Sequence, residues 1–159
     1  MRILVTGGAG FIGSHYVRTM LSGGYPGYED AAVTVLDNLT YAGNLANLAP
    51  VSDHPRLRFV PGDIADSALV RSLLPGHDAV INFAAETHVD RSISGAAPFV
   101  TTNVAGVQVL LQACLDAGVG PVVRCPPTRC TEASRRVRGP SRRRWRRTRR
   151  TRRPRPAVT

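Results

Sequence analysis

Hydrophobic and polar positions follow two alternating patterns over the first 124 residues. Short apolar runs, typical of buried strands, are followed by longer stretches in which apolar residues recur every three or four positions, as on one face of a helix. The apolar runs predict strands at residues 2–6, 33–36, 58–60 and 79–84, and the start of a fifth at 122–123. The helical pattern covers residues 11–22 and 98–116, and Asp66 is a candidate cap for a further helix that ends at Leu74. Strands joined by helical crossovers predict an α/β fold with a doubly wound parallel sheet.

The apolar periodicity stops at residue 125. From there to residue 159 arginine and proline dominate, and a segment with so few apolar side chains is predicted to be disordered. The charge divides at the same position. Residues 1–124 hold seven arginines against ten acidic residues, a charge of −3, whereas residues 125–159 hold fourteen arginines against one acidic residue, a charge of +13. The formal charge of +10 therefore describes a mildly acidic domain, residues 1–124, followed by a basic tail, residues 125–159.

Composition narrows the class of protein further. The first residues lack the charged region and apolar stretch of a signal peptide, and no apolar run approaches the roughly 20 residues that cross a bilayer. Cys114 falls on the helical apolar pattern and is predicted to be a buried thiol, whereas Cys125 and Cys130 lie in the tail, away from the histidines. We therefore expect a cytoplasmic protein with no disulfide framework, no metal site and no membrane partner.

Three glycines stand between the first predicted strand and the first predicted helix. Gly7, Gly10 and Gly13 have the spacing G-x-x-G-x-x-G. The first glycine lets the chain turn sharply, the second lets a pyrophosphate approach the backbone, and the third lets the helix pack against the sheet. Free N–H groups at the start of the helix then face the phosphates. A simple tight turn is the alternative, but the place of the motif between strand and helix favours a Rossmann-type dinucleotide site.

Two aspartates follow the next predicted strands. Asp37 ends the second strand, where a carboxylate can bind both ribose hydroxyls of an adenosine. Its charge would repel a 2′-phosphate and no arginine stands next to it, which favours NAD over NADP. Asp63 follows the third strand, and two interpretations of it stay open: it accepts a hydrogen bond from the adenine amine, or it caps a helix.

Longer motifs carry a resemblance to a known family. They are T-G-G-A-G-F-I-G-S-H, L-D-N-L-T-Y-A-G-N-L-A-N-L, G-D-I, N-F-A-A-E-T-H-V-D-R-S and T-N-V-x-G. Together they resemble the extended short-chain dehydrogenase/reductase family, and most closely its dTDP-glucose 4,6-dehydratase branch. The resemblance covers residues 1–124 nearly without a gap. The glycine motif is shared across the superfamily, whereas D-N-L-T-Y-A-G-N and A-A-E-T-H-V-D-R-S are much more specific to the dehydratases.

The resemblance implies positions for the cofactor NAD and for a substrate. The residues implied to hold the pyrophosphate are Gly7, Gly10, Phe11, Ile12 and Gly13. Those implied around the adenosine are Asp37, Asn38, Leu39 and Thr40 at the ribose, with Asp63 and Ile64 at the adenine. Those implied beside the nicotinamide are Ala84, Ala85 and Glu86. His88 and Arg91 are implied to approach a dTDP-sugar or related nucleotide sugar, with a surface pair on an irregular loop as the alternative. The resemblance also implies a homodimer formed through helices, of which residues 98–116 are one.

The family's chemistry depends on groups that the sequence lacks. In the family, a tyrosine base beside a lysine helps NAD to oxidise the sugar at C4, a glutamate and an aspartate eliminate water across C5 and C6, and hydride returns to C6. These groups lie on S-T-D-E-V-Y-G and Y-x-x-x-K, and the sequence contains neither motif and no lysine. The chain thus resembles a truncated NAD-dependent lyase without its catalytic residues. The alternatives are a 4-epimerase or decarboxylase of the same fold, or a protein whose arginine tail binds nucleic acid non-specifically.

The tail offers an explanation for the missing motifs. All 21 basic residues are arginine, a bias typical of a gene rich in G and C. If the reading frame slipped by one base near Arg124, residues 125–132 would conceal V-S-[T/P]-D-E-V-Y-G, and a Y-x-x-x-K would lie beneath Thr151 and Arg155. The concealed codon beneath Thr128 permits aspartate and excludes serine. Aspartate at this position is typical of the dehydratases, and serine is typical of the epimerases. We hypothesise that residues 125–159 are an out-of-frame translation.

Overall fold

The computed structural model describes residues 1–87 and 95–125. Along the chain its elements are β1 (Arg2–Thr6), α1 (Phe11–Leu21), β2 (Ala32–Asp37), the 3₁₀ helix η1 (Leu45–Val51), β3 (Leu57–Pro61), α2 (Ser67–Leu73), β4 (Ala79–Asn82), α4 (Ala97–Val100), the π-helical segment η2 (Thr101–Gly106), α5 (Val107–Ala117) and β5 (Val122–Arg124). Residues Met1–Cys125 form one compact unit.

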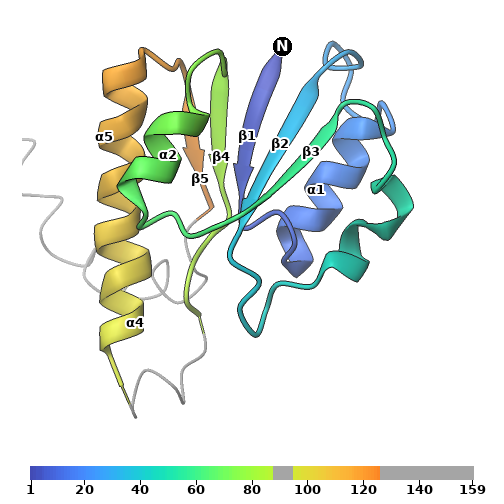
Figure 1. The fold of residues 1–159 in the computed structure, drawn as a ribbon. Coiled ribbons are helices and arrows are strands. Elements are labelled where there is room, and N and C mark those ends of the chain that lie inside the picture. The colour runs from blue at the N-terminus through green and yellow to red at the C-terminus, as the bar shows by residue number, and fades with distance from the viewer. Residues whose placement is uncertain (88–94, 126–159) are drawn as a thin grey trace, which may run out of the picture. The chain divides into compact units, whose positions relative to one another are not determined.

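The strands form one parallel sheet in the order β3-β2-β1-β4-β5 (Figure 1). The chain leaves the central strand β1 toward β2 and β3, then crosses back to β4 on the other side of β1. The crossovers from β1 therefore diverge at the carboxyl ends of β1 and β4, which is where ligands bind in open α/β sheets. The predicted doubly wound, Rossmann-type parallel sheet is confirmed.

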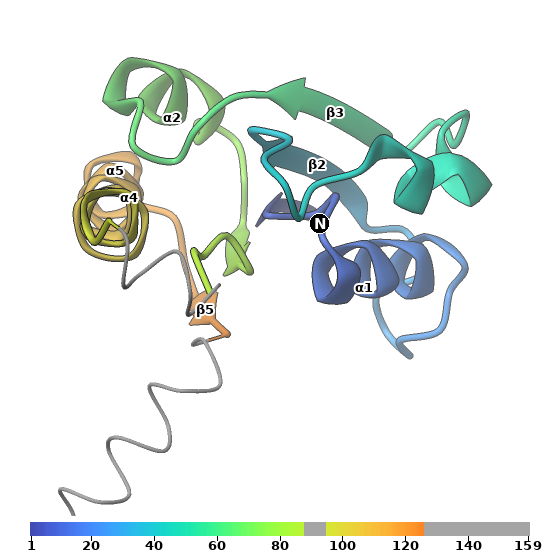
Figure 2. The same ribbon diagram turned by 90° about the horizontal axis from the view of Figure 1, so that it is seen from below.

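Different helices cover the two faces of the sheet. Figure 2 shows α1 on one side of the sheet and α2 and α5 on the other. Leu4 of β1 belongs to the core beneath α2 and α5, whereas Ile3 and Val5 belong to the core beneath α1 and η1. Because successive side chains of a strand point to opposite faces, a strand buried on both faces has to be apolar throughout. This explains the uninterrupted apolar run that predicts β1.

The observed elements lie close to the predicted ones, with two differences. The fourth strand ends at Asn82, so residues 83 and 84 belong to the loop that follows β4. The 3₁₀ helix η1 was not predicted. Its apolar residues Leu45, Leu48 and Val51 recur at a spacing of three, which matches three residues per turn and not the 3.6 of an α-helix. The predicted cap is confirmed: the Asp66 side chain accepts hydrogen bonds from the backbone N–H groups of Ala68 and Leu69 at the start of α2.

One helix is long and apolar enough to cross a membrane by length and composition alone. It runs from Ala97 to Ala117 through α4, η2 and α5, with 21 residues, a mean hydropathy of 1.3 and 28% of it buried. Polar residues such as Thr101, Asn103 and Gln112 interrupt it, so it is not an uninterrupted apolar run of the kind that the prediction excluded. Val107, Leu110 and Cys114 of this helix pack into the core with α2, as in a helix that covers a sheet. Cys114 is buried as predicted, and burial raises the pKa of its thiol.

Candidate functional site

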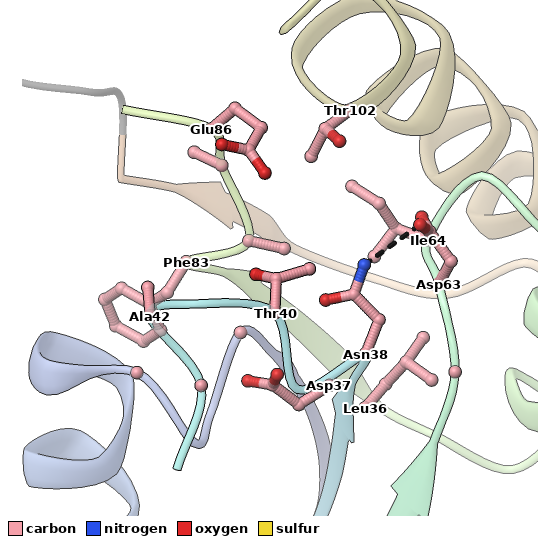
Figure 3. Close-up of a pocket in the computed structure, with 16 residues that line it drawn as sticks. Leu36, Asp37, Asn38, Thr40, Ala42, Asp63, Ile64, Phe83, Glu86 and Thr102 are labelled. Carbon is pink, nitrogen blue, oxygen red and sulfur yellow. Dashed lines mark hydrogen bonds between the residues drawn. The ribbon is translucent and has the colours of Figure 1, made fainter. Parts of the chain in front are cut away.

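A pocket opens at the carboxyl edge of the sheet, where the chain leaves β1, β2, β3 and β4 (Figure 3). Its lining comes from the loops after these four strands and from the helix that contains η2. The lining residues are Gly7, Gly10, Leu36, Asp37, Asn38, Thr40, Ala42, Gly43, Gly62, Asp63, Ile64, Phe83, Ala84, Ala85, Glu86 and Thr102. Parallel strands bring their carboxyl ends to one edge, so residues far apart in the sequence meet there.

The glycine turn is packed too closely for side chains. Gly7 has a φ of +69°, and a Cβ on it would lie 2.5 Å from the backbone nitrogen of Ala84. A Cβ on Gly13 would lie 2.2 Å from the carbonyl oxygen of Gly7, so the third glycine lets α1 rest directly on the turn. Gly10 is the N-cap of α1, and no side chain caps this end of the helix. The turn thus leaves the positive end of the helix dipole facing the pocket edge.

Asp37 connects the glycine turn to the loop after β2. Asp37 is buried, with 6% of the residue exposed, and Oδ2 accepts a hydrogen bond of 2.9 Å from the backbone N–H of Ala9. Oδ1 accepts a bond of 2.8 Å from the N–H of Leu39, which adopts the left-handed conformation with a φ of +51°. A Cβ on Gly43 would lie 2.6 Å from Oδ1, so the loop closes tightly around the carboxylate. The structure therefore holds Asp37 in one orientation at the pocket.

Asp63 is held in a similar way at the end of β3. Oδ1 accepts a hydrogen bond of 2.8 Å from the N–H of Ala65, and Oδ2 accepts one of 3.0 Å from the side-chain amide of Asn38. Figure 3 shows this side-chain pair across the loops that follow β2 and β3. The helix-cap interpretation of Asp63 is wrong, because Asp66 caps α2 and Asp63 closes only the turn before it.

A half-buried amide fixes the loop after β4. The side chain of Asn103 accepts a hydrogen bond of 2.9 Å from the N–H of Glu86 and donates one of 2.9 Å to the carbonyl oxygen of Glu86. Asn103 lies in the π-helical segment η2, one residue after Thr102, which lines the pocket. The wider turn of a π-helix changes the direction in which its side chains point, and π-helical turns occur frequently at functional sites.

Most of the residues named from the sequence lie around this one pocket. The exceptions within the described chain are Phe11, Ile12, Gly13 and Leu39, which flank it without lining it. The side chain of Phe11 is 90% exposed. His88 and Arg91 lie outside the described residues. Six lining residues were not named from the sequence, although all of them stand inside the quoted motifs: Leu36, Ala42, Gly43, Gly62, Phe83 and Thr102.

The fold and the pocket define a Rossmann-type domain with a site at its topological switch point, and comparison with known proteins names the family. A family model described as GDP-mannose 4,6 dehydratase matches residues 4–134, and the chain belongs to this family. A dTDP-glucose 4,6-dehydratase of Streptomyces niveus is 63% identical over 113 residues, which cover 71% of this chain and 34% of the relative.

Solved structures agree with this assignment. The dTDP-glucose 4,6-dehydratase of Streptomyces venezuelae, with NAD among its bound ligands, is 64% identical with a TM-score of 0.75 over 77% of this chain and 38% of that protein. A UDP-glucose 4-epimerase of Thermotoga maritima is similar at 34% identity, with a TM-score of 0.66 over 78% of this chain and 37% of that one. The chain spans between a third and two-fifths of the length of these relatives.

Proposed function

We propose that this chain is the NAD-binding part of a nucleotide-sugar 4,6-dehydratase whose substrate is dTDP-glucose or a close relative. The observation that carries the proposal is the pocket at the switch point, where the glycine turn, Asp37 and Asp63 meet. The comparisons support the dehydratase over the epimerase alternative, because identity to the Streptomyces dehydratase structure is 64% against 34% for the epimerase.

The glycine turn would hold the pyrophosphate. Gly7, Gly10 and Gly13 leave the backbone bare, so a phosphate can approach the N–H groups of Phe11 and Ile12 at the uncapped start of α1. The partial positive charge at this helix end stabilises an anion there. A side chain at Gly7 would collide with Ala84, so the turn accepts only glycine at that position.

The loops after β2 and β3 would hold the adenosine. Asp37, with both oxygens already oriented by backbone N–H groups, is placed to accept hydrogen bonds from the ribose hydroxyls, with Asn38, Leu39 and Thr40 around the sugar. Asp63 and Ile64 would face the adenine. The Asp37 carboxylate would repel a 2′-phosphate, so we propose NAD and not NADP as the cofactor.

The other half of the cofactor would lie toward β4. Ala84, Ala85 and Glu86 would flank the nicotinamide, and His88 and Arg91 would approach the sugar nucleotide. When bound, NAD supplies a reversible hydride acceptor for the sugar. The residues of this chain bind and orient the cofactor and exclude water from it. Because the sequence holds no lysine and no Y-x-x-x-K, we propose that the chain as given carries no catalytic residue and does not turn over substrate.

A calorimetric titration of the full chain, with NAD and separately with NADP, tests this function. We expect NAD to bind and NADP to bind at least about tenfold more weakly because of the buried Asp37 charge. No 4-keto-6-deoxy sugar should form from dTDP-glucose. Equal affinity for the two dinucleotides would overturn the proposed choice of cofactor, and a measured dehydratase rate would overturn the proposed absence of catalysis.

We propose residues 1–124 as the NAD-binding domain and residues 125–159 as an out-of-frame basic tail. Sequencing the gene across the codon for Arg124 tests the second statement: a confirmed single frame with no slipped base would end it. The nucleic-acid alternative predicts a gel shift that weakens steeply with salt and disappears when residues 125–159 are deleted. We propose a cytoplasmic location for the protein.

A homodimer is the remaining proposed partner. Four apolar side chains on the helix of α4, η2 and α5 are 45% exposed or more, namely Val100, Val104, Leu111 and Leu115. If they form a dimer interface, Leu115→Lys, at a side chain that is 77% exposed, should shift the full chain to a monomer in analytical ultracentrifugation without lowering its melting temperature. An unchanged distribution of species would contradict the dimer.

A further inference from the structure

The Asn38–Asp63 pair is a side-chain contact between the loops that follow β2 and β3. Asn38 directly follows β2 and Asp63 stands two residues after β3, the strand that pairs with β2. The Asn38 amide donates a hydrogen bond of 3.0 Å to Oδ2 of Asp63, and both side chains line the pocket (Figure 3). The proposed function gives Asp63 a role at the adenine and leaves the amide of Asn38 without one.

The two anchors on Asp63 act on different oxygens. The N–H of Ala65 holds Oδ1 at 2.8 Å, and the Asn38 amide holds Oδ2. A carboxylate offers about four lone-pair sites, so two sites remain for a ligand. With the Ala65 bond alone, the carboxylate could rotate about its terminal torsion, which has broad preferences. Asn38 therefore selects the direction in which the free lone pairs of Asp63 point.

The backbone at Asn38 is set by its neighbours and not by its own side chain. The N–H of Leu39 donates to Oδ1 of Asp37, and the N–H of Gly62 donates to the carbonyl oxygen of Asp37 at 3.0 Å. The side chain of Asn38 is exposed. A substitution at Asn38 therefore removes the anchor on Asp63 and leaves the fold of the loop in place.

We propose that Asn38 is a positioning residue that orients Asp63 and so makes the site selective for adenine over a purine with a carbonyl group at C6. A fixed carboxylate accepts a hydrogen bond from the exocyclic amine of adenine. The same carboxylate faces a lone pair when the amine is replaced by a carbonyl oxygen, and the two acceptors repel. This inference rests on the proposed NAD site and adds the residue that determines its choice of base.

The experiment compares NAD with nicotinamide hypoxanthine dinucleotide, which differs from NAD in carrying a carbonyl group at C6 of the purine. Both are titrated against the full chain and against Asn38→Ala, Asp63→Ala and the double variant. We expect the unmodified chain to prefer NAD about tenfold, and Asn38→Ala to lose most of that preference because it weakens the binding of NAD more than that of the hypoxanthine dinucleotide. The double variant should match Asp63→Ala, because Asn38 acts through Asp63.

The isosteric variant Asn38→Asp adds a readout that a structural role would not move. Near neutral pH its carboxylate repels Asp63, so the preference for NAD should be lost. As the pH falls and one carboxyl of the pair takes up a proton, a donor returns and the preference should recover. The unmodified chain should show no such recovery over the same pH range.

Three results would overturn the inference. Asn38→Ala weakening both dinucleotides equally would make Asn38 a structural residue, provided that its melting temperature matches that of the unmodified chain. NAD binding without any discrimination in the unmodified chain would refute the inference and leave the proposed function standing. Binding of neither dinucleotide would refute the proposed function and the inference together.

Discussion

The described residues complete two regions to different degrees: the side of the pocket proposed to bind adenosine, called the adenosine side below, and the β4–β5 side of the sheet. On the adenosine side, Asp37 and Asp63 each have both carboxylate oxygens bonded, and α1 and η1 cover the sheet. On the other side, β5 is a three-residue edge strand and Val123 is 57% exposed. The loops that directly follow β2 and β3 can thus form the adenosine side of the site, although the β4–β5 side of the described sheet is less covered.

An apolar groove marks the less complete side. It lies between α1 and the strands β1, β4 and β5, with a volume of about 240 Å³. Its lining includes Tyr16, Tyr25, Ile81 and Val123. The Tyr16 ring lies 5.3 Å from that of Tyr25 and 5.5 Å from that of Phe83, and burial, with the neighbouring tyrosines, raises the pKa of the Tyr16 hydroxyl. In contrast to the polar contacts around Asp37, aromatic and aliphatic side chains form the described lining of this groove.

The largest expected effect comes from breaking the glycine turn. Gly13→Ala places a Cβ 2.2 Å from the carbonyl oxygen of Gly7, so either α1 or the turn has to move. We expect a loss of about 3 kcal/mol in unfolding free energy, measured by urea denaturation, together with loss of NAD binding. Gly95→Ala is the control, because its Cβ would meet no atom of the described residues within 4 Å. A difference between the two variants below about 1 kcal/mol would contradict the close packing of the turn.

The next effect tests the polar contacts of Asp37. Asp37→Asn leaves one of two backbone N–H donors, those of Ala9 and Leu39, facing an amide NH₂ group. A buried unsatisfied donor costs about 1–3 kcal/mol, and we expect that loss in urea denaturation along with weaker NAD binding. Asp53→Asn, at an exposed aspartate before β3, should change neither quantity. Weaker binding with unchanged stability would show that Asp37 serves the ligand and not the loops.

A smaller effect is expected on the β4–β5 side. Val123→Lys adds a charge to an exposed position that lines the groove, where little packing is lost. We expect stability to change by less than about 0.5 kcal/mol, while the binding of an apolar fluorescent dye decreases. A strong loss of stability would show that the groove is packed as completely as the adenosine side.

The smallest effect is on pH dependence and involves His77, which lies away from both regions. Its Nε2 lies 2.9 Å from the Thr34 hydroxyl, and Nδ1 is buried without a hydrogen-bond partner among residues 1–87 and 95–125. Burial, with the positive charges of Arg2 and Arg58, lowers the pKa of His77 below 6.5 in the folded chain. The unfolded chain therefore takes up the proton first, so stability should fall as the pH drops below about 6.5 and level off below the folded pKa.

Urea denaturation from pH 7.5 to 5 measures this dependence. His77→Gln should flatten it, whereas His15→Gln, at an exposed histidine on α1, should not. NAD affinity should be the same for both variants, because neither residue lines the pocket. A slope that survives in His77→Gln would assign the pH dependence to another group.

The parts of the site that could be predicted are those that depend on short sequence segments. Asp37 follows an apolar run, and the glycine spacing identifies the turn, because strand, turn and helix are contiguous. The Asn38–Asp63 and Asn103–Glu86 contacts could not be predicted, because they join residues 25 and 17 positions apart whose meeting depends on strand order and on the π-helical segment. The helix-cap interpretation of Asp63 could be rejected only from the observed cap at Asp66, and its adenine contact stays a prediction.

The central claim is that the described residues complete the adenosine side of an NAD site. Competition between NAD and ADP-ribose for the full chain tests it most directly, because ADP-ribose lacks the nicotinamide ring and keeps the adenosine and pyrophosphate assigned to the glycine turn, Asp37 and Asp63. We expect the affinity of the chain for ADP-ribose to lie within about threefold of its affinity for NAD. An affinity for NAD more than about 100-fold above that for ADP-ribose, or no binding of ADP-ribose at all, would contradict it.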